Sequence, residues 1–118
     1  MDMESIRTYC LKKPGDISEG TPFGDDVLVF KVSGKIFLLA SLASYPLTIN
    51  LKSEPSRAIE LRERYEAVRP GYHMNKKHWN TVRLDGSVPS SLVYQMIDES
   101  YDQVLRTLKK TGSSGLRS

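Results

Sequence analysis

One segment of this chain gathers most of the side chains that are suited to bind an anion. Residues 69–83 read RPGYHMNKKHWNTVR and contain four Lys or Arg, both histidines, the only tryptophan and no acidic residue. The chain has 17 Lys and Arg against 14 Asp and Glu, so without these four it is close to neutral. Lys and Arg neutralise phosphates, and an exposed Trp stacks on bases or inserts between them. The segment is therefore a predicted contact surface for a polyanion.

The centre of this segment is expected to form an exposed basic loop. Lysine and arginine would neutralise phosphates, while histidine and asparagine would donate hydrogen bonds to phosphates or base edges. Trp79 either touches a sugar or base, or packs with Met74 into the core and so holds the charged side chains rigidly. The candidate binding residues in this segment are Arg69, Tyr72, His73, Asn75, Lys76, Lys77, His78 and Trp79.

A predicted β-hairpin offers a second basic surface. Residues 27–32 and 35–42 are rich in branched and aromatic side chains and are separated by Ser-Gly, a pair that suits a two-residue hairpin turn. Lys35 follows this turn, and Lys31 and Lys52 lie on neighbouring predicted strands. Lysines on exposed strand faces also keep sheets soluble, so a purely structural role stays open.

The sequence predicts neither a metal site nor an active site. His73 and His78 lie five residues apart without a nearby Cys or carboxylate, and the adjacent lysines would repel a cation. Phosphate-binding glycine motifs and nucleophile motifs are absent. The carboxylate pairs at 25–26 and 98–99 are interpreted as plain surface charges. We therefore expect no enzymatic activity, no metal and no cofactor.

Length and composition are typical of one globular domain. The chain has 118 residues, of which 39% are hydrophobic and 26% charged. A lone Cys10 favours a reducing compartment and a packed thiol, and the acidic N-terminus does not resemble an export signal. The longest apolar stretch, residues 36–43, is shorter than the ~20 residues that span a bilayer, so no membrane partner is expected. A cytoplasmic location follows as the expectation.

Periodicity predicts a mixed fold. We expect residues 1–110 to form a single domain and residues 111–118 to be a polar, disordered tail. Residues 14–26 contain several glycines and prolines and are interpreted as a loop. Helices are predicted at 2–13, 55–68 and 89–110, and strands at 27–32, 35–42, 47–52 and 81–84. This order predicts an α+β domain in which three helices pack on one face of an antiparallel sheet of about four strands.

Several strings of the sequence resemble one known family. They are KPGDISEGTPFG from Lys13, VFKVSGKIF from Val29, NLKSEP from Asn50 and PGYHMNKKHWNTVRLDGS from Pro70. Together they resemble the MmcQ/YjbR family of small bacterial proteins over residues 5–110. The resemblance implies a CyaY-like fold and DNA binding through a "double wing". In this chain the wings would be the turn at 33–35 and the loop at 72–79. It does not imply iron binding.

The expected function is DNA binding without catalysis in the cytoplasm. About four to five phosphate contacts, including Lys35, would give a slope of log affinity against log salt near −4. Duplex and single-stranded DNA remain equally open. The alternative is a domain that uses the segment HMNKKHW to bind a small anion or the acidic tail of a protein.

Overall fold

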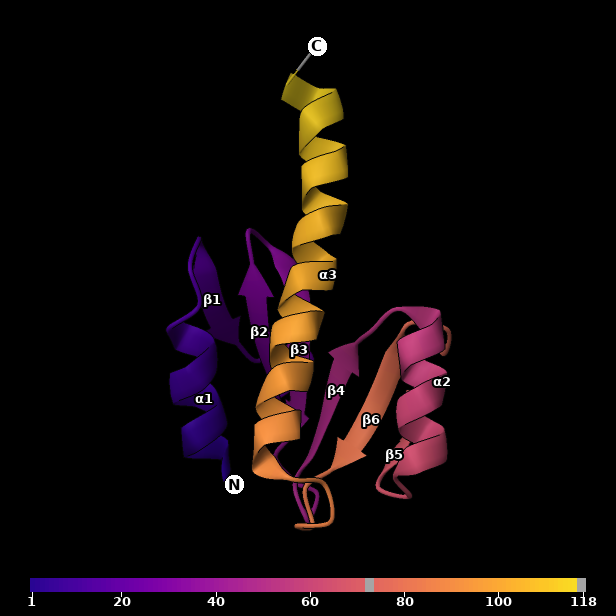
Figure 1. Cartoon of the computed structure of the whole chain (residues 1–118). Helices are drawn as coiled ribbons and strands as arrows, with labels where there is room; N and C mark the ends of the chain where they lie inside the picture. Colours follow the sequence, from indigo (N-terminus) through magenta and orange to yellow (C-terminus); the bar gives the residue numbers. More distant parts are fainter. Residues whose placement is uncertain (72–73, 117–118) are drawn as a thin grey trace.

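The fold is an antiparallel sheet with helices on one face (Figure 1). The structure, a computed structural model, describes residues 1–71 and 74–116, with the backbone alone for 110–116. The helices are α1 (Met3–Leu11), α2 (Pro55–Arg64) and α3 (Ser90–Leu116). The strands are β1 (Ile17–Gly20), β2 (Val27–Val32), β3 (Lys35–Ser41), β4 (Thr48–Lys52), β5 (Val68–Pro70) and β6 (Trp79–Arg83). The predicted α+β class is confirmed, with six strands in the order β1-β2-β3-β4-β6-β5 instead of about four.

The first helix forms as its sequence predicts. Asp2 is the N-cap, and its Oδ1 accepts a hydrogen bond from the backbone N–H of Ser5 at 2.9 Å. One face of α1 buries Ile6 and Cys10 completely. Burial raises the pKa of the Cys10 thiol to about 12, since a thiolate is disfavoured in an apolar environment. Cys10 is therefore a packed side chain, as expected.

The core lies between α3 and the sheet. Phe30, Leu38 and Ile49 are fully buried on the helix side of the sheet. The ring of Phe37 meets the ring of Tyr101 edge to face, with centroids 5.5 Å apart. Further buried side chains in this cluster are Val32, Ala40, Leu51, Val82, Val93, Met96, Ile97 and Val104. This burial fixes α3 across the middle of the sheet.

A buried serine joins α3 to two strands. Ser100 Oγ donates a hydrogen bond to the carbonyl of Phe37 at 2.5 Å and accepts one from the backbone N–H of Lys52 at 2.8 Å. Ser100 is fully buried, so both bonds are shielded from water. They set the position of α3 relative to the ends of β3 and β4 at which the candidate site lies.

Two strands were not predicted. β1 lies within the segment interpreted as a loop, and β5 replaces the end of the predicted second helix. β1 is an edge strand in which only Ile17 is a good strand former, and it is held by pairing with β2 from Ile17–Val32 to Gly20–Val29. The helix α2 ends at Arg64 because Tyr65 is extended, and Val68 then pairs with Val82 of β6. Tertiary pairing overrides the local pattern in both places.

The third helix is longer than predicted. Its backbone is helical to Leu116, so residues 111–116 of the expected tail belong to α3. No proline interrupts this segment, and an existing helix gains one hydrogen bond for each residue added. In Figure 1 the end of α3 projects beyond the sheet. Residues 117–118 of the expected tail lie outside the described residues.

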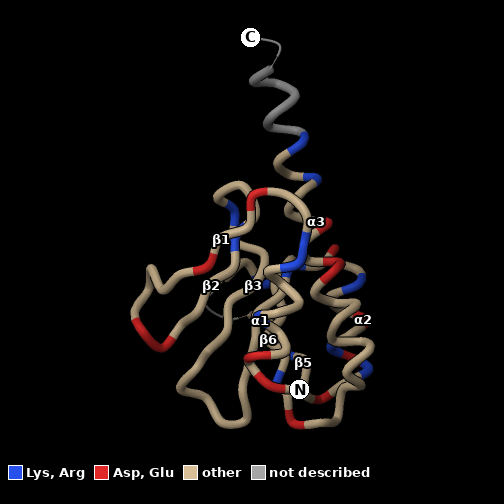
Figure 2. Tube along the Cα trace, turned by 90° about the vertical axis from the view of Figure 1, so that its left-hand side faces the viewer, with Lys and Arg blue, Asp and Glu red and all other residues tan. Residues whose placement is uncertain are grey.

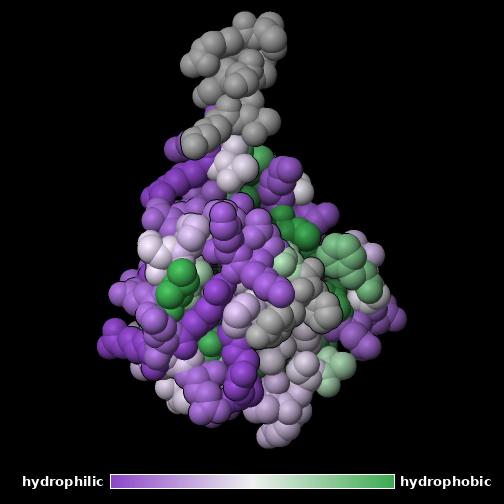
Figure 3. Space-filling view, turned by 90° about the vertical axis from the view of Figure 1, so that its right-hand side faces the viewer, coloured by the Kyte–Doolittle hydropathy of each residue, from purple (hydrophilic) through white to green (hydrophobic). Residues whose placement is uncertain are grey.

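Carboxylates of α3 connect it to the other two helices, which corrects their interpretation as plain surface charges. Asp98 accepts a hydrogen bond from the hydroxyl of Tyr9 at 2.7 Å and forms an ion pair with Lys13. Glu99 accepts a hydrogen bond from Arg57 of α2 at 3.2 Å. No local pattern indicates these contacts, because the partners are more than 40 residues away along the chain. Around α2 the surface is mostly hydrophilic (Figure 3).

Candidate functional site

The face of the sheet opposite the helices is basic. The register of β4 and β6 places Lys52 beside Trp79, Asn50 beside Thr81 and Thr48 beside Arg83, all on this open face. Thr81 Oγ1 donates a hydrogen bond to Asn50 Oδ1 at 2.5 Å, which agrees with that assignment. Among the described strand positions that point to this face none is acidic. Its basic residues are Lys31, Lys52, Arg69 and Arg83.

A groove of about 360 Å³ lies at the end of the sheet, beside α3. It is formed where the β2–β3 turn, the end of β4, the start of β6 and the second half of α3 meet. Trp79 and Val104 in its lining are 9% and 3% exposed, so they form the floor together with the half-buried Ile36 and Met74. The other lining residues are Lys31, Gly34, Lys35, Lys52 and Thr107. The groove thus combines an apolar floor with three ammonium groups.

The lysines of the groove have no acidic partner. Among the described residues, no carboxylate forms an ion pair with Lys31, Lys35 or Lys52. Other cations are paired: Arg7 lies 2.6 Å from Glu19, and Arg83 lies 2.7 Å from Asp85. Like charges that converge without a counter-charge attract anions from solution. The groove is the place where the structure gathers positive charge on an apolar surface.

An arginine of α2 holds the loop that closes one side of the groove. Arg62 Nε donates a hydrogen bond to Asn80 Oδ1 at 2.6 Å, and its Nη2 donates to the carbonyl of Lys76 and to that of Trp79 at 3.5 Å. Asn80 Nδ2 donates in turn to the carbonyl of Ala58 at 3.2 Å. These bonds tie the loop to α2. Sequence reasoning missed Arg62, since its position in a charged helix carries no signal of a bond to a loop 14 residues later.

The backbone of the loop makes its own turn. Asn75 Oδ1 accepts a hydrogen bond from the N–H of Lys77 at 2.9 Å, and the carbonyl of Asn75 accepts from the N–H of Trp79 at 2.9 Å. Gly71 N–H donates to the carbonyl of Trp79 at 2.8 Å. A Cβ added at Gly71 would lie 3.1 Å from the Trp79 carbonyl oxygen, so this close approach requires glycine. The loop is positioned before any ligand arrives.

The predicted site residues do not all lie in one place. Lys35 and Trp79 line the groove, and Trp79 is buried there, so of its two predicted roles the structure agrees with packing into the core and not with an exposed, stacking ring. Its ring is part of the packing between loop and sheet. The residues that are exposed outside the groove are Arg69, Asn75, Lys76 and Lys77.

Two histidines were predicted to donate hydrogen bonds, and one of them is described. His78 is half-buried, and its Nδ1 is buried without a hydrogen-bond partner among the described residues. Tyr72 and His73 lie outside the described residues. Lys31 and Lys52, which sequence reasoning weighed as a second basic patch, lie in the same groove as Trp79 and Met74. The two predicted wings therefore meet at one place.

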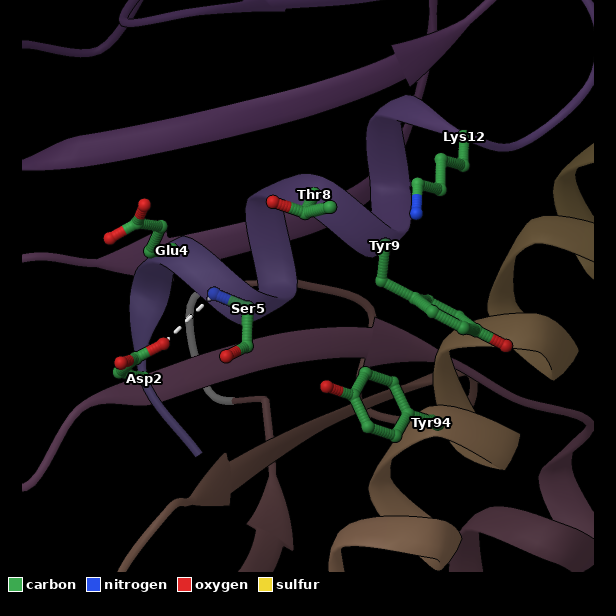
Figure 4. A pocket seen from close by; sticks show the side chains of 7 residues that line it. All are labelled: Asp2, Glu4, Ser5, Thr8, Tyr9, Lys12 and Tyr94. Carbon is green, nitrogen blue, oxygen red and sulfur yellow. Dashed lines mark hydrogen bonds between the residues drawn. The ribbon is translucent and has the colours of Figure 1, made fainter.

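A second hollow lies beside α1 (Figure 4) and differs in character. Its volume is about 470 Å³, and the rings of Tyr9 and Tyr94 line it with centroids 4.5 Å apart. Two of its polar side chains are already engaged, since Asp2 caps α1 and the Tyr9 hydroxyl donates to Asp98. It offers Glu4 as well as Lys12, so its charge is mixed. No anion preference follows from this arrangement.

Searches for two other kinds of site gave negative results within the described residues. No group of three or more His, Cys, Asp or Glu side chains is arranged to hold a metal ion. No helix in that part of the chain is both long and apolar enough to cross a membrane.

Comparison with known proteins identifies the family. The YjbR family model matches residues 11–103. The chain is 40% identical to the uncharacterized protein YbdF of Escherichia coli O157:H7 over 97 residues, 81% of this chain and 79% of that protein. It is 36% identical to the uncharacterized protein YjbR of Escherichia coli K12 over 109 residues, 92% of this chain and 91% of that protein.

Two solved structures have the same fold. A crystal structure of a Deinococcus radiodurans protein superposes with a TM-score of 0.79 at 40% identity, over 83% of this chain and 74% of that one. A crystal structure of a Pseudomonas syringae protein gives 0.71 at 28% identity, over 85% of this chain and 96% of that one. Sequence and structure agree over most of the chain, which therefore belongs to the YjbR family.

Proposed function

We propose that this chain is a cytoplasmic protein that binds DNA and catalyses no reaction on it. The observation that carries the proposal is the groove lined by Lys31, Lys35 and Lys52, for which the described residues provide no carboxylate partner. Three ammonium groups at the end of a sheet match the repeated negative charge of a phosphate backbone. Among the described strand positions of the open face none is acidic, which adds to the attraction because no carboxylate at these positions repels the polyanion.

The two wings implied by the family resemblance support the same surface. The turn residue Gly34 and Lys35 line the groove from β2 and β3, and Met74 and Trp79 line it from the loop. Lys77 and Arg69 are exposed nearby in sequence and would add phosphate contacts at its edge. In this arrangement the lysines give affinity, while the anchored loop fixes the position of the backbone that they bind.

The proposal is tested by fluorescence anisotropy of a labelled DNA at two salt concentrations. The variant Lys35→Gln/Lys52→Gln is expected to weaken binding by about tenfold or more and to lower the salt slope by ~1.4–1.8, the value for two lost phosphate contacts. The matched control Lys12→Gln/Arg64→Gln removes the same net charge away from the groove and is expected to bind within about twofold of the wild type.

Equal weakening by both double variants would show that only the net charge matters and would contradict the groove as the binding surface. Absence of binding to any DNA at low salt, together with saturable binding of a small anion such as inorganic phosphate, would replace the proposal by the small-anion alternative. An acidic peptide used as a third probe distinguishes the protein-tail alternative in the same assay.

A further inference from the structure

We propose that the groove holds one unpaired nucleotide, so that the chain prefers single-stranded DNA to duplex. This inference rests on the proposed DNA binding and specifies the form of DNA. It places the base on the apolar floor of Ile36, Met74, Trp79 and Val104, and the flanking phosphates at the three lysines. The apolar floor of the groove, its size and its charge each support this placement.

The apolar floor needs an apolar partner. Phosphates and sugars are polar, and in a duplex the faces of the bases are covered by their stacked neighbours. An unpaired base has a free face that can lie on aromatic or aliphatic side chains. A duplex would satisfy the lysines but would leave Ile36 and Met74 in contact with water or phosphate. The floor therefore distinguishes the two forms of DNA.

The size of the groove fits a single small group. Its volume of about 360 Å³ lies at the lower end of the range of pockets that hold one small ligand, ~300–1,000 Å³. A base with its sugar fits such a space, whereas a base pair held in a double helix cannot enter it. Binding a base here requires no opening of the protein, because Arg62 and the close contact of Gly71 with Trp79 already fix the loop.

The three positive charges of the groove favour a DNA strand over a single small organic acid as the ligand. A lone carboxylate would compensate one ammonium group and leave two others unpaired. A strand carries a phosphate on each side of every base, so it brings several negative charges to Lys31, Lys35 and Lys52 together. Beyond Lys52, the open face continues the basic surface to the exposed Arg69, along which a longer strand meets no acidic strand residue among those described.

The first test compares a labelled single strand of mixed sequence with the duplex formed from it. We expect the single strand to bind at least tenfold tighter. Ile36→Ala is expected to weaken binding of the single strand by about fivefold or more and to leave the duplex unchanged, since one base–side-chain contact is lost. The matched control Ile59→Ala changes an equally sized, half-exposed side chain on α2 and should bind like the wild type.

Met74→Ala provides a second floor variant outside the strands, in case Ile36→Ala reduces the folded fraction. The only tryptophan of the chain, Trp79, gives a direct signal, because a base on the floor should quench its fluorescence. Quenching by the single strand and none by the duplex at equal saturation is the expected result. A strand with abasic sites throughout should bind more weakly and leave the fluorescence unchanged.

Binding of the duplex as tight as that of the single strand, or wild-type affinity in both floor variants, would overturn the single-strand inference and leave the proposed DNA binding intact. If neither form of DNA binds at low salt, the proposed function itself fails. The two failures are therefore distinguished by one set of titrations.

Discussion

The groove and the cleft between α2 and α3 use cations in opposite ways. The cleft has a volume of about 290 Å³ and contains Arg57 and Arg106. Arg57 donates to Glu99 at 3.2 Å and to Glu60 at 2.5 Å, and Arg106 donates to Glu54 at 3.1 Å. Figure 2 shows basic and acidic residues interspersed along α2. In the groove, by contrast, the described residues give the lysines no carboxylate.

This difference shows which charged side chains take part in contacts within the fold. The hydrogen bond to Glu60 raises the pKa of Arg57, so its charge is committed to a partner within α2, and its second bond, to Glu99, reaches α3. Such partly exposed ion pairs contribute little stability, but they cancel the field that an anion would sense. The lysines of the groove, in contrast, form no ion pair among the described residues. Under the proposed function, a phosphate backbone would supply the negative charge that these lysines lack.

The largest effect is expected from reversing the charges of the groove. Lys35→Glu/Lys52→Glu should reduce DNA affinity by about 100-fold or more, because phosphates then meet two carboxylates on a restricted surface. Arg57→Glu/Arg106→Glu makes the same change of net charge in the cleft and should cost less than about threefold. Anisotropy titrations at low salt measure both. Comparable losses in the two variants would remove the distinction between groove and cleft.

A third use of a cation is the anchoring of the loop by Arg62, and its loss should affect stability. Arg62→Met keeps most of the apolar stem but removes the donor that bonds to Asn80 Oδ1 and to the carbonyls of Lys76 and Trp79, of which the Trp79 carbonyl keeps its bond from Gly71 N–H. We expect a loss of about 1–3 kcal/mol in the free energy of unfolding, the cost of unsatisfied polar groups. Urea denaturation measures it, with Arg64→Met, whose guanidinium lies over the Tyr65 ring, as control.

The same variant sharpens the argument that the loop is positioned in advance. If Arg62 only stabilises the fold, DNA affinity at a temperature where the variant is fully folded equals that of the wild type. If it positions Met74 and Trp79, single-strand affinity falls by about threefold while duplex binding does not change. Hydrogen exchange at the amide of Trp79 reports the loosening independently, since this amide donates within the loop.

The difference between the groove and the cleft can also be tested by removing carboxylates that pair with the arginines of the cleft. Glu54→Gln/Glu60→Gln should remove the carboxylates that lie 3.1 Å from Arg106 and 2.5 Å from Arg57 and raise DNA affinity at low salt by about twofold to threefold. Because the cleft lacks an apolar floor, the gain should be equal for single strand and duplex. An increase confined to the single strand would mean that an apolar floor is unnecessary for that preference.

Among the elements that support the groove, those that depend on residues close together in the sequence were predicted. Those that depend on residues far apart in the sequence were not. Asp2 as a cap and the Ser33-Gly34 turn act within a few residues, and both were predicted. β1 and β5 depend on partners that are distant along the chain, and neither was predicted. Val68 fits the spacing of a helix but pairs with Val82, so no local pattern could identify the strand.

The groove itself depends on sheet order, which explains what sequence reasoning missed. Lys35 and Trp79 were candidate residues, but nothing in their spacing indicates that β4 separates β3 from β6 and places Lys52 between them. From its spacing in the sequence, Val104 is an ordinary core position of α3. That it also forms part of the floor of the groove depends on where α3 passes the end of the sheet. The sequence left open whether Trp79 is exposed or packs into the core, and its place beside Lys52 at the start of β6 buries it.

The smallest effect concerns stability at high pH, which should depend on the paired helix layer and not on the groove. The hydrogen bond to Asp98, followed by burial, raises the pKa of Tyr9 to about 12. Because this folded-state pKa exceeds the value of 10.0 for a free tyrosine, the stabilisation is fully present below pH 10 and is lost as the pH rises toward 12.

Tyr9→Phe should therefore flatten the decline of the urea midpoint between pH 9.5 and 11 (about the range that linkage sets). Tyr94→Phe, which removes a hydroxyl without a bond to Asp98, should keep the wild-type slope. An unchanged slope in Tyr9→Phe would show that the bond to Asp98 does not contribute to folding, and the helix layer would then resemble the groove in holding charges that the fold does not need.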